Sequence, residues 1–540
     1  MSSLDSTQTP TSVPEKPYTE WKPRKPELLV MVSLSVISLM VSLDTTVIVP
    51  ALPTLADALK GTANDTFWTG TSYLLASAVF QPIIGSISDI FGRRELLLLA
   101  LSLFTIGTTV CCTADGFTQL LIGRSIKGIG GGGILVMVMI IFTDIVPLRH
   151  RPKWFGFIQA SWAIGTISGP AIGGLLAQHT TWRWIFYINF PFCGLGFLLV
   201  PIVVRIEIED KLSFKENIVL VDWIGGTLFI ASTTSFLIAL TWGGVEFAWS
   251  SFRTLVPLFI GLAGIVGTVC WELWGANRPL LRLFLFNGPS AFGAYISAML
   301  QGLLLFALMY YVPFWFEAIK EMSPTMSGVG IMPTTAGLLP SSVIVGIIMT
   351  RFGRFRWAIW SGWALALLAT GCMILWGTHT NTTSWALMLL VLGLGHGLIL
   401  SSVNLAAQAI ANEEDVAFAA ALYTFLRSFG MCLGVAIGGV VFQNVLTRSL
   451  RNRGLPGEIA PNATAFLATL KAMPMTDYKQ HILDAYAEAF KGVFATLTGI
   501  SGLGLIAGLA IGKHSMDKKL ASRHSLVIKN TDVNVSESPA

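Results

Sequence analysis

The sequence predicts an all-α polytopic membrane protein with fourteen membrane-spanning helices, arranged as six, two and six. Three observations predict this fold class. Of the 540 residues, 53% are apolar and only 12% are charged, and the mean hydropathy is +0.68, which excludes a soluble globule. The apolar residues form separate runs long enough to cross a bilayer. Motifs of the first six runs also recur in the last six.

The chain opens with a polar, proline-containing segment, residues 1–27, which we expect to be a disordered cytoplasmic tail. The first apolar run has spanning length, so it is expected to stay in place as a helix instead of being cleaved as a signal peptide. Six runs then form an N-terminal bundle over residues 28–205. The expected spans are 28–51, 66–87, 95–113, 118–142, 155–178 and 183–205.

The second part of the chain begins with a charged linker. Residues 206–289 are expected to hold this linker and two extra spans, at 222–243 and 252–274. Six further spans make a C-terminal bundle over residues 290–511, with a long extracellular loop at 447–487 before the last of them. Residues 512–540 are expected to be a second cytoplasmic tail.

Lys and Arg residues indicate the orientation. With the N-terminus inside, the inner segments hold 22 of them and the outer loops hold 9, as the positive-inside rule requires. The Asn-x-Ser/Thr sequons at Asn64, Asn381 and Asn462 fall in loops expected to lie outside, where they are candidate glycosylation sites. Both termini are therefore expected in the cytoplasm.

An internal repeat predicts the architecture. Gly85, Phe91, Gly92 and Arg93 recur in the same register as Gly346, Phe352, Gly353 and Arg354. The stretch 165–174 recurs at nearly the same offset as 430–439. Spans 1 to 6 are thus repeated in the same orientation as spans 9 to 14. Parallel six-helix repeats are typical of alternating-access transporters, with the substrate between the repeats near the midplane.

The loop from Gly85 to Arg94 joins the second span to the third. Gly92 allows a sharp turn, while Asp89, Arg93 and Arg94 can form charge-assisted hydrogen bonds with neighbouring helix ends. We interpret the loop as a conformational latch. A plain topology signal is the alternative, but it explains only the arginines.

The stretch Gly165 to Gly174 places glycines at 165, 169 and 173 one helical turn apart, and Gly174 follows. This stripe lets another helix backbone approach closely. Pro170 interrupts the helix beside the stripe, which in lipid requires a neighbouring helix or a cavity. We expect the fifth span and its repeat, the thirteenth, to lie at the interface of two repeats that rock against each other. Ordinary tight helix packing is the alternative interpretation.

These motifs together resemble the major facilitator superfamily, over roughly residues 28–511. The loop 85–94 looks like the family's loop 2-3 signature, 121–133 like its span-4 motif, and 165–174 like its span-5 antiporter motif. The stretch 43–53 resembles the span-1 motif of the fourteen-span drug:proton antiporters. The resemblance implies the major facilitator fold, a proton-coupling role for Arg124, and export instead of import. Within the group, the chain reads most like fungal pumps for toxins and secondary metabolites. Lys127 departs from the motif, which usually has an uncharged residue there.

Arg124 and Asp44 also indicate a proton site on physical grounds. A charge inside a span is costly and is by default a functional hypothesis. At 1.5 Å rise per residue, the two residues reach nearly the same depth in a core about 30 Å thick. We therefore expect them to interact, with protonation of Asp44 weakening the pair while Arg124 stays charged. A static structural pair is the alternative.

Nucleotide-driven transport is not expected. Gly128 to Gly133 satisfies the GxGxxG pattern, but the pattern lies in an apolar helix with no strand before it. No phosphate-binding GxxxxGK[ST] motif occurs in the sequence. The six cysteines lie in or beside apolar runs and form neither a CxxC pair nor a metal-ligand spacing. We expect no cofactor, no metal and no nucleic-acid or nucleotide partner.

An apolar cavity with few polar anchors suits amphipathic organic molecules. Gln301 and Tyr310 in the ninth span, and Asn404 and Gln408 in the twelfth, are candidates for such anchors. Arg427 is expected to snorkel to the cytoplasmic interface, and a role in stabilising helix ends or in the inner gate is the alternative.

The leading hypothesis is proton-coupled export (antiport) of hydrophobic or amphipathic small molecules, such as toxins, drugs or secondary metabolites. The expected location is the plasma membrane, with the vacuolar membrane as an alternative. Alternative functions are a proton symporter that imports a nutrient or siderophore, and a transporter-like receptor. An enzyme is not expected, because no HExxH or GxSxG motif occurs.

Overall fold

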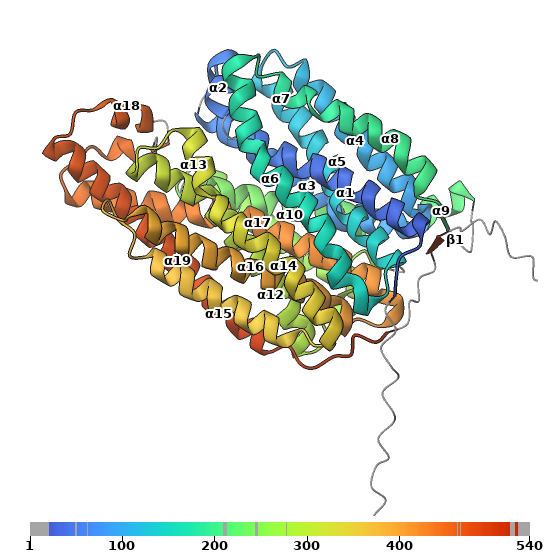
Figure 1. Cartoon of the computed structure of the whole chain (residues 1–540). Helices are drawn as coiled ribbons and strands as arrows, with labels where there is room; N and C mark the ends of the chain where they lie inside the picture. Colours follow the sequence, from blue (N-terminus) through green and yellow to red (C-terminus); the bar gives the residue numbers. More distant parts are fainter. Residues whose placement is uncertain are drawn as a thin grey trace, which may run out of the picture.

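The computed structural model is almost wholly helical, and its long helices run side by side in one bundle (Figure 1). It describes residues 21–48, 51–61, 63–208, 213–243, 247–276, 278–461, 463–464, 466–518 and 524–526. In this described part, one antiparallel strand pair interrupts the helical pattern.

The first six spans form the N-terminal half, drawn from blue to teal in Figure 1. Two shorter helices lie between them. Helix α2 has Pro53 in its first turn, where proline is tolerated, and α7 follows the turn at 180–183. The bounds are α1 (Lys25–Val47), α2 (Leu52–Leu59), α3 (Ala63–Phe91), α4 (Arg93–Cys112), α5 (Phe117–Ile145), α6 (Arg151–His179), α7 (Trp184–Tyr187) and α8 (Asn189–Val203).

A hairpin of two helices separates the halves in sequence. It follows β1 (Ile206–Ile208) and α9 (Phe214–Leu220), and consists of α10 (Trp223–Trp242) and α11 (Phe252–Trp274). The two helices approach closely, since a Cβ on Gly261 would lie 2.5 Å from the backbone N of Phe236. The Phe236 ring stacks on Phe429 of the C-terminal half, with centroids 6.4 Å apart. The hairpin therefore packs on α3 and α17, where the two halves meet.

The C-terminal half repeats the plan of the first. Its long helices are α12 (Pro289–Ile319), α14 (Met332–Phe352), α15 (Arg356–Met373), α16 (Thr382–Ile410), α17 (Val416–Asn452) and α19 (Asp477–Leu509). The shorter elements are α13 (Pro324–Gly330), α18 (Phe466–Ala472), β2 (His524–Leu526) and the 3-10 turns η2 (Leu148–His150), η3 (Leu283–Phe286), η4 (Glu413–Asp415) and η5 (Gly457–Ile459).

Packing follows the same pattern in both halves. Helix α1 packs on α6 as α12 packs on α17, α3 packs on α5 as α14 packs on α16, and α4 packs on α5 as α15 packs on α16. The halves meet mainly where α6 contacts α14 and where α17 contacts α3 and α5. The described residues thus form two equivalent six-helix units with a hairpin at their seam.

The described residues hold fourteen long helices at the expected spans. Judged by length and apolar composition, thirteen of them could cross a membrane. The remaining one, α15, begins at Arg356 and carries three tryptophans, which lowers its apolarity. It still packs between α16 and α19 in the way α4 packs between α5 and α8. The chain is therefore a multi-pass membrane protein.

The long loop before the last span is shorter than the expected 447–487. Helix α17 continues to Asn452, because Leu446 and Leu450 are fully buried there. Helix α19 begins at Asp477, where the Thr476 hydroxyl accepts a hydrogen bond from the Lys479 amide. Only residues 453–476 connect the two helices.

The described terminal segments meet on one face of the bundle. The Trp21 ring lies 6.1 Å from the His150 ring, and Arg149 pairs with Asp517 at 2.7 Å. Strand β2 pairs with β1, with Ile206 opposite Leu526. An even number of crossings explains why the described segments before α1 and after α19 reach the same face.

Candidate functional site

A buried charge cluster lies inside the N-terminal half. Nη1 of Arg124 is 3.1 Å from Oδ2 of Asp44, and both side chains are 1% exposed. Nζ of Lys127 is 2.5 Å from Oδ1 of the same carboxylate and is fully buried. Asn189 donates a third hydrogen bond to Asp44 at 3.3 Å. The structure thus brings Asp44 and Arg124 together and adds a second cation to the pair.

Neighbouring helices position the two cations. Nε of Arg124 donates to the Thr69 carbonyl of α3 at 2.9 Å, and its guanidinium lies 4.4 Å from the Tyr73 ring centroid. Nζ of Lys127 lies between two aromatic rings, 4.7 Å from the centroid of Phe104 and 5.1 Å from that of Phe186. Such rings attract a desolvated cation electrostatically.

Glycines let the helices that carry this cluster approach one another. A Cβ on Gly107 of α4 would lie 2.4 Å from the backbone N of Lys127. A Cβ on Gly128 would meet the Tyr73 carbonyl at 2.5 Å. The glycines of α5 therefore allow the backbones of α3 and α4 to approach α5 closely. Helix α5 is continuous there, and among the described residues no strand precedes it, as a dinucleotide site would require.

The loop between α3 and α4 forms a second charge cluster at the face where the chain termini meet. Arg93 pairs with Asp89 at 2.9 Å and with the buried Asp144 of α5 at 3.0 Å. Gly92 adopts φ +108°, a conformation that disfavours other residues. Arg94 is half-buried next to Arg93 and forms no ion pair with the described residues.

This cluster extends into the C-terminal half. Nη2 of Arg282 lies 3.9 Å from Asp89, and the same side chain forms an ion pair with Asp415 at the start of α17. Its guanidinium covers the Phe418 ring, 3.4 Å from the centroid. Gly85 faces Ala421 of α17, at 3.5 Å from a Cβ built on the glycine. The motif loop and α17 are thus linked by charge and by close packing, a connection that sequence reasoning missed.

Two expected cavity residues lie at a contact between the halves. Arg151 donates to Oε1 of Gln408 at 2.8 Å, and Gln408 donates to Oδ1 of Asn404 at 2.8 Å. All three side chains are buried. Asn404 and Gln408 therefore hold α16 against the start of α6, on the side of the bundle where the termini meet.

The glycine stripe of α6 faces α1. A Cβ on Gly165 would lie 1.9 Å from Oγ of Ser42, and one on Gly169 would lie 2.0 Å from Oγ1 of Thr46. Gly173 and Gly174 continue the buried side. Pro170 points elsewhere, toward Gly328 of α13 in the other half, 3.4 Å from a Cβ built there. The stretch therefore packs α6 on its own half through the glycines and contacts the opposite half through the proline.

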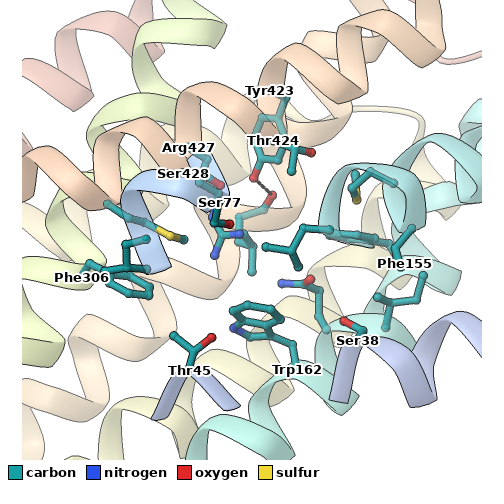
Figure 2. Close-up of a pocket in the computed structure, with 18 of the residues that line it drawn as sticks. Ser38, Thr45, Ser77, Phe155, Trp162, Phe306, Tyr423, Thr424, Arg427 and Ser428 are labelled. Carbon is teal, nitrogen blue, oxygen red and sulfur yellow. Dashed lines mark hydrogen bonds between the residues drawn. The ribbon is translucent and has the colours of Figure 1, made fainter. Parts of the chain in front are cut away.

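A cavity lies between the halves, with side chains from both directed into it (Figure 2). Arg427 and Ser428 of α17 lie across it from Trp162 of α6. Oγ of Ser428 accepts a hydrogen bond from Nε2 of Gln81 on α3, a buried contact between the halves at 3.0 Å. Further residues that line the cavity are Tyr73, Ser77, Phe155, Phe306, Thr424 and Met431.

The four expected anchors do not line this cavity. Gln301 is buried behind it and accepts a hydrogen bond from Nε of Arg427 at 3.0 Å. Tyr310 lies further along α12 and is 40% exposed. Arg427 enters the cavity instead of snorkelling to the interface. The missed signal was its neighbourhood, because Tyr423 and Thr424, four and three residues before it, share a helical face with Arg427.

The candidate glycosylation sites are placed as follows. Asn381 is exposed and caps α16, its Oδ1 accepting from the Ser384 amide at 2.8 Å. Asn64 lies in the first turn of α3. Asn462 falls outside the described residues.

Comparisons with known proteins agree with one another. The model of the family described as "Major Facilitator Superfamily" matches residues 34–435. The chain is 42% identical over 489 residues to "MFS transporter L2" of Phoma sp., covering 90% of this chain and 82% of that protein. It is 36% identical over 498 residues to "MFS efflux transporter aclA" of Aspergillus oryzae, covering 90% and 89%. It is 34% identical over 490 residues to "Efflux pump FUS6" of Gibberella fujikuroi, covering 88% and 87%.

Solved structures share the fold. The human organic anion transporter MFSD10 superposes with a TM-score of 0.56 at 15% identity, over 90% of this chain and 100% of that one. The proton:xylose symporter XylE gives a TM-score of 0.55 at 14% identity, over 89% and 94%. At such identity the likeness concerns the arrangement of helices alone.

Proposed function

Since the chain belongs to the major facilitator superfamily, a family of membrane transporters, we propose that it exports hydrophobic or amphipathic small molecules in exchange for protons. Export would proceed by alternating access, with the cavity between the halves opening to one side of the membrane at a time. Family membership makes it a transporter and not an enzyme.

Two observations support export. Relatives covering nearly the whole chain carry the names "MFS efflux transporter aclA" and "Efflux pump FUS6". The stretch Gly165 to Gly174 also resembles the antiporter motif, and in the structure it packs tightly on α1 while Pro170 contacts the other half. Toxins and secondary metabolites are the substrates we favour, since aromatic and aliphatic side chains line the cavity together with hydroxyl, amide and guanidinium groups, a mixture that suits amphipathic organic molecules.

The main support for the proposed proton coupling is the burial of Asp44 between two cations, Arg124 and Lys127. A proton on this carboxyl group would remove the charge that holds Arg124 and Lys127. Arg124 stays charged in proteins, so it would then need another partner. Occupancy of Asp44 by a proton would thereby change which arrangement of α1 and α5 is stable.

The charge cluster at Arg93 would couple this rearrangement of α1 and α5 to the C-terminal half. Arg93 ties α3 and α4 to α5 through Asp144, and Asp89 reaches Arg282 and hence α17. We infer that these contacts close the cytoplasmic side and must separate when the cavity opens inward. We propose that both termini lie in the cytoplasm and that the location is the plasma membrane.

Efflux from cells tests the proposal. Cells with the intact protein would be loaded with a panel of fluorescent amphipathic compounds and compared with cells carrying Arg124→Ala, with and without a protonophore. We expect protein-dependent efflux that is lost in both treatments. Protein-dependent accumulation would reverse the direction, and efflux that survives the protonophore would refute proton coupling.

A further inference from the structure

Arg427 is a cation of the cavity without a carboxylate partner. Its Nε donates to the neutral amide oxygen of Gln301, and none of the described Asp or Glu side chains forms an ion pair with it. No carboxylate lines the cavity within the part of the chain that the structure describes. A charge held in an apolar membrane interior without a counter-ion is costly, so it calls for a ligand that balances it.

The other side of the cavity is also positive. Asp44 faces two cations, so the cluster of Asp44, Arg124 and Lys127 has one positive charge in excess. This cluster borders the cavity through Tyr73, whose ring lies 4.4 Å from the Arg124 guanidinium and which itself lines the cavity. The cavity therefore lies between two unbalanced positive charges on opposite halves. Low dielectric walls strengthen the resulting field.

The remaining lining is amphipathic. Phe155, Trp162 and Phe306 offer aromatic surface. Ser77 and Thr424 add hydroxyl groups near Arg427 (Figure 2). A guanidinium presents a planar fork of N–H donors, which fits a group that carries two oxygens on one edge, such as a carboxylate.

We propose that the cavity selects organic acids, amphipathic molecules with an aromatic or aliphatic body whose ionised carboxylate binds to Arg427. This assignment rests on the proposed function, because it takes the cavity between the halves as the substrate site. It narrows that function from hydrophobic compounds in general to anionic ones. Trp162 and Phe306 hold the body of the molecule, and Arg427 sets the preference for charge.

Binding to the purified full-length protein tests the charge preference separately from transport. The probes are coumarin-3-carboxylate, 1-naphthoate and anthracene-9-carboxylate, each beside its methyl ester, with dissociation constants measured by calorimetry at pH 7.5. We expect the wild type to bind the acids at least about tenfold more tightly than their esters, the effect of one charged hydrogen bond. Arg427→Gln should reduce that ratio at least several-fold, by weakening acid binding much more than ester binding. Arg427→Lys should keep part of the preference, because it keeps the charge and loses the fork.

A matched control lies on the same helix. Arg448 is exposed on α17 and does not line the cavity, so Arg448→Gln should leave the acid-to-ester ratio unchanged. Esters that bind as tightly as acids to the wild type, or binding of no acid, would overturn the proposal. So would equal losses for acid and ester in both Arg427 variants, since that result indicates a structural role. Failure of the proposed function shows elsewhere, as the absence of proton-driven efflux in cells.

Discussion

Nζ of Lys127 lies 2.5 Å from the carboxylate of Asp44, and both side chains are buried inside the N-terminal half. The carboxylate thus faces two cations, because Arg124 occupies its other oxygen. Removing one member of a buried ion pair leaves an uncompensated charge, which costs far more than the pair contributes. This arrangement allows transport and stability to be separated by mutation.

Asp44→Asn should abolish proton-driven export and lower the free energy of unfolding by about 3–5 kcal/mol, since it leaves two buried cations unpaired. The double variant Asp44→Asn with Lys127→Met removes one of those cations and should recover much of the lost stability without recovering transport. Thermal unfolding in detergent and efflux in cells measure the two effects. Full transport activity in Asp44→Asn would exclude this carboxyl group as the proton site.

Arg93→Ala should reduce export at least about tenfold, because it removes the ion pairs that join Asp89 and the buried Asp144. Arg94→Ala is the matched control. It is the next residue and equally basic, but forms no ion pair with the described residues, so its effect should be small. Efflux rates at equal expression decide the matter. Similar losses of efflux rate in both variants would show that the loop contributes only its positive charge and not the specific ion pairs of Arg93.

Gly169→Ala should destabilise the protein by about 1–3 kcal/mol, because its Cβ would lie 2.0 Å from Oγ1 of Thr46 on α1. Gly194→Ala is the control, since none of the described residues comes within 4 Å of a Cβ there and helix propensity then favours alanine. Melting temperatures of the two variants should shift in opposite directions. Adding Thr46→Ala to Gly169→Ala should restore part of the loss. An unchanged melting temperature in Gly169→Ala would contradict the close approach of α6 and α1.

A disulfide should lock the two halves. A Cβ built on Gly156 of α6 lies 3.7 Å from Cβ of Val343 on α14, within the range for a disulfide. In a background without the native cysteines, Gly156→Cys with Val343→Cys should cross-link under oxidation and stop transport, and a reductant should restore it. Each single variant serves as a control. Transport that continues in the cross-linked protein would show that α6 and α14 need not separate.

The fold could be predicted because the features that specify it, apolar runs and repeated motifs, depend only on positions along the sequence. Each span is a run of apolar residues, and the repeat needs only the matching positions of residues such as Gly85 and Gly346. Both ends of the expected loop 447–487 are helical, because Leu446 and Leu450 belong to a helix that continues past the bilayer-length run. Helical continuation depends on packing against α19, which the local sequence does not contain.

For the candidate site, the sequence predicted how deep each residue lies in the membrane but not toward which neighbour its side chain points. Counting residues along α1 and α5 places Asp44 and Arg124 at one level, and the structure has them in contact. The direction of Gln301 and Arg427 depends on how each helix is rotated about its axis. Helices α12 and α17 are apolar nearly all round, so the periodicity of the sequence does not specify that rotation. For the same reason Asn404 and Gln408 were expected in the cavity and instead lie at the contact with Arg151.

The surplus positive charge beside Asp44 has an electrical consequence. We expect each reorientation of the cavity to shift this buried charge relative to the membrane, so that part of the transmembrane voltage acts on it. One elementary charge that crosses the whole field changes the free energy by about 2.3 kcal/mol per 100 mV. We therefore expect turnover in proteoliposomes to respond to a potassium diffusion potential even at equal pH on both sides. Lys127→Met, which makes the cluster neutral, should weaken that response, while the charge of Arg427 remains in both proteins. The membrane potential would then help to drive transport beside the proton gradient.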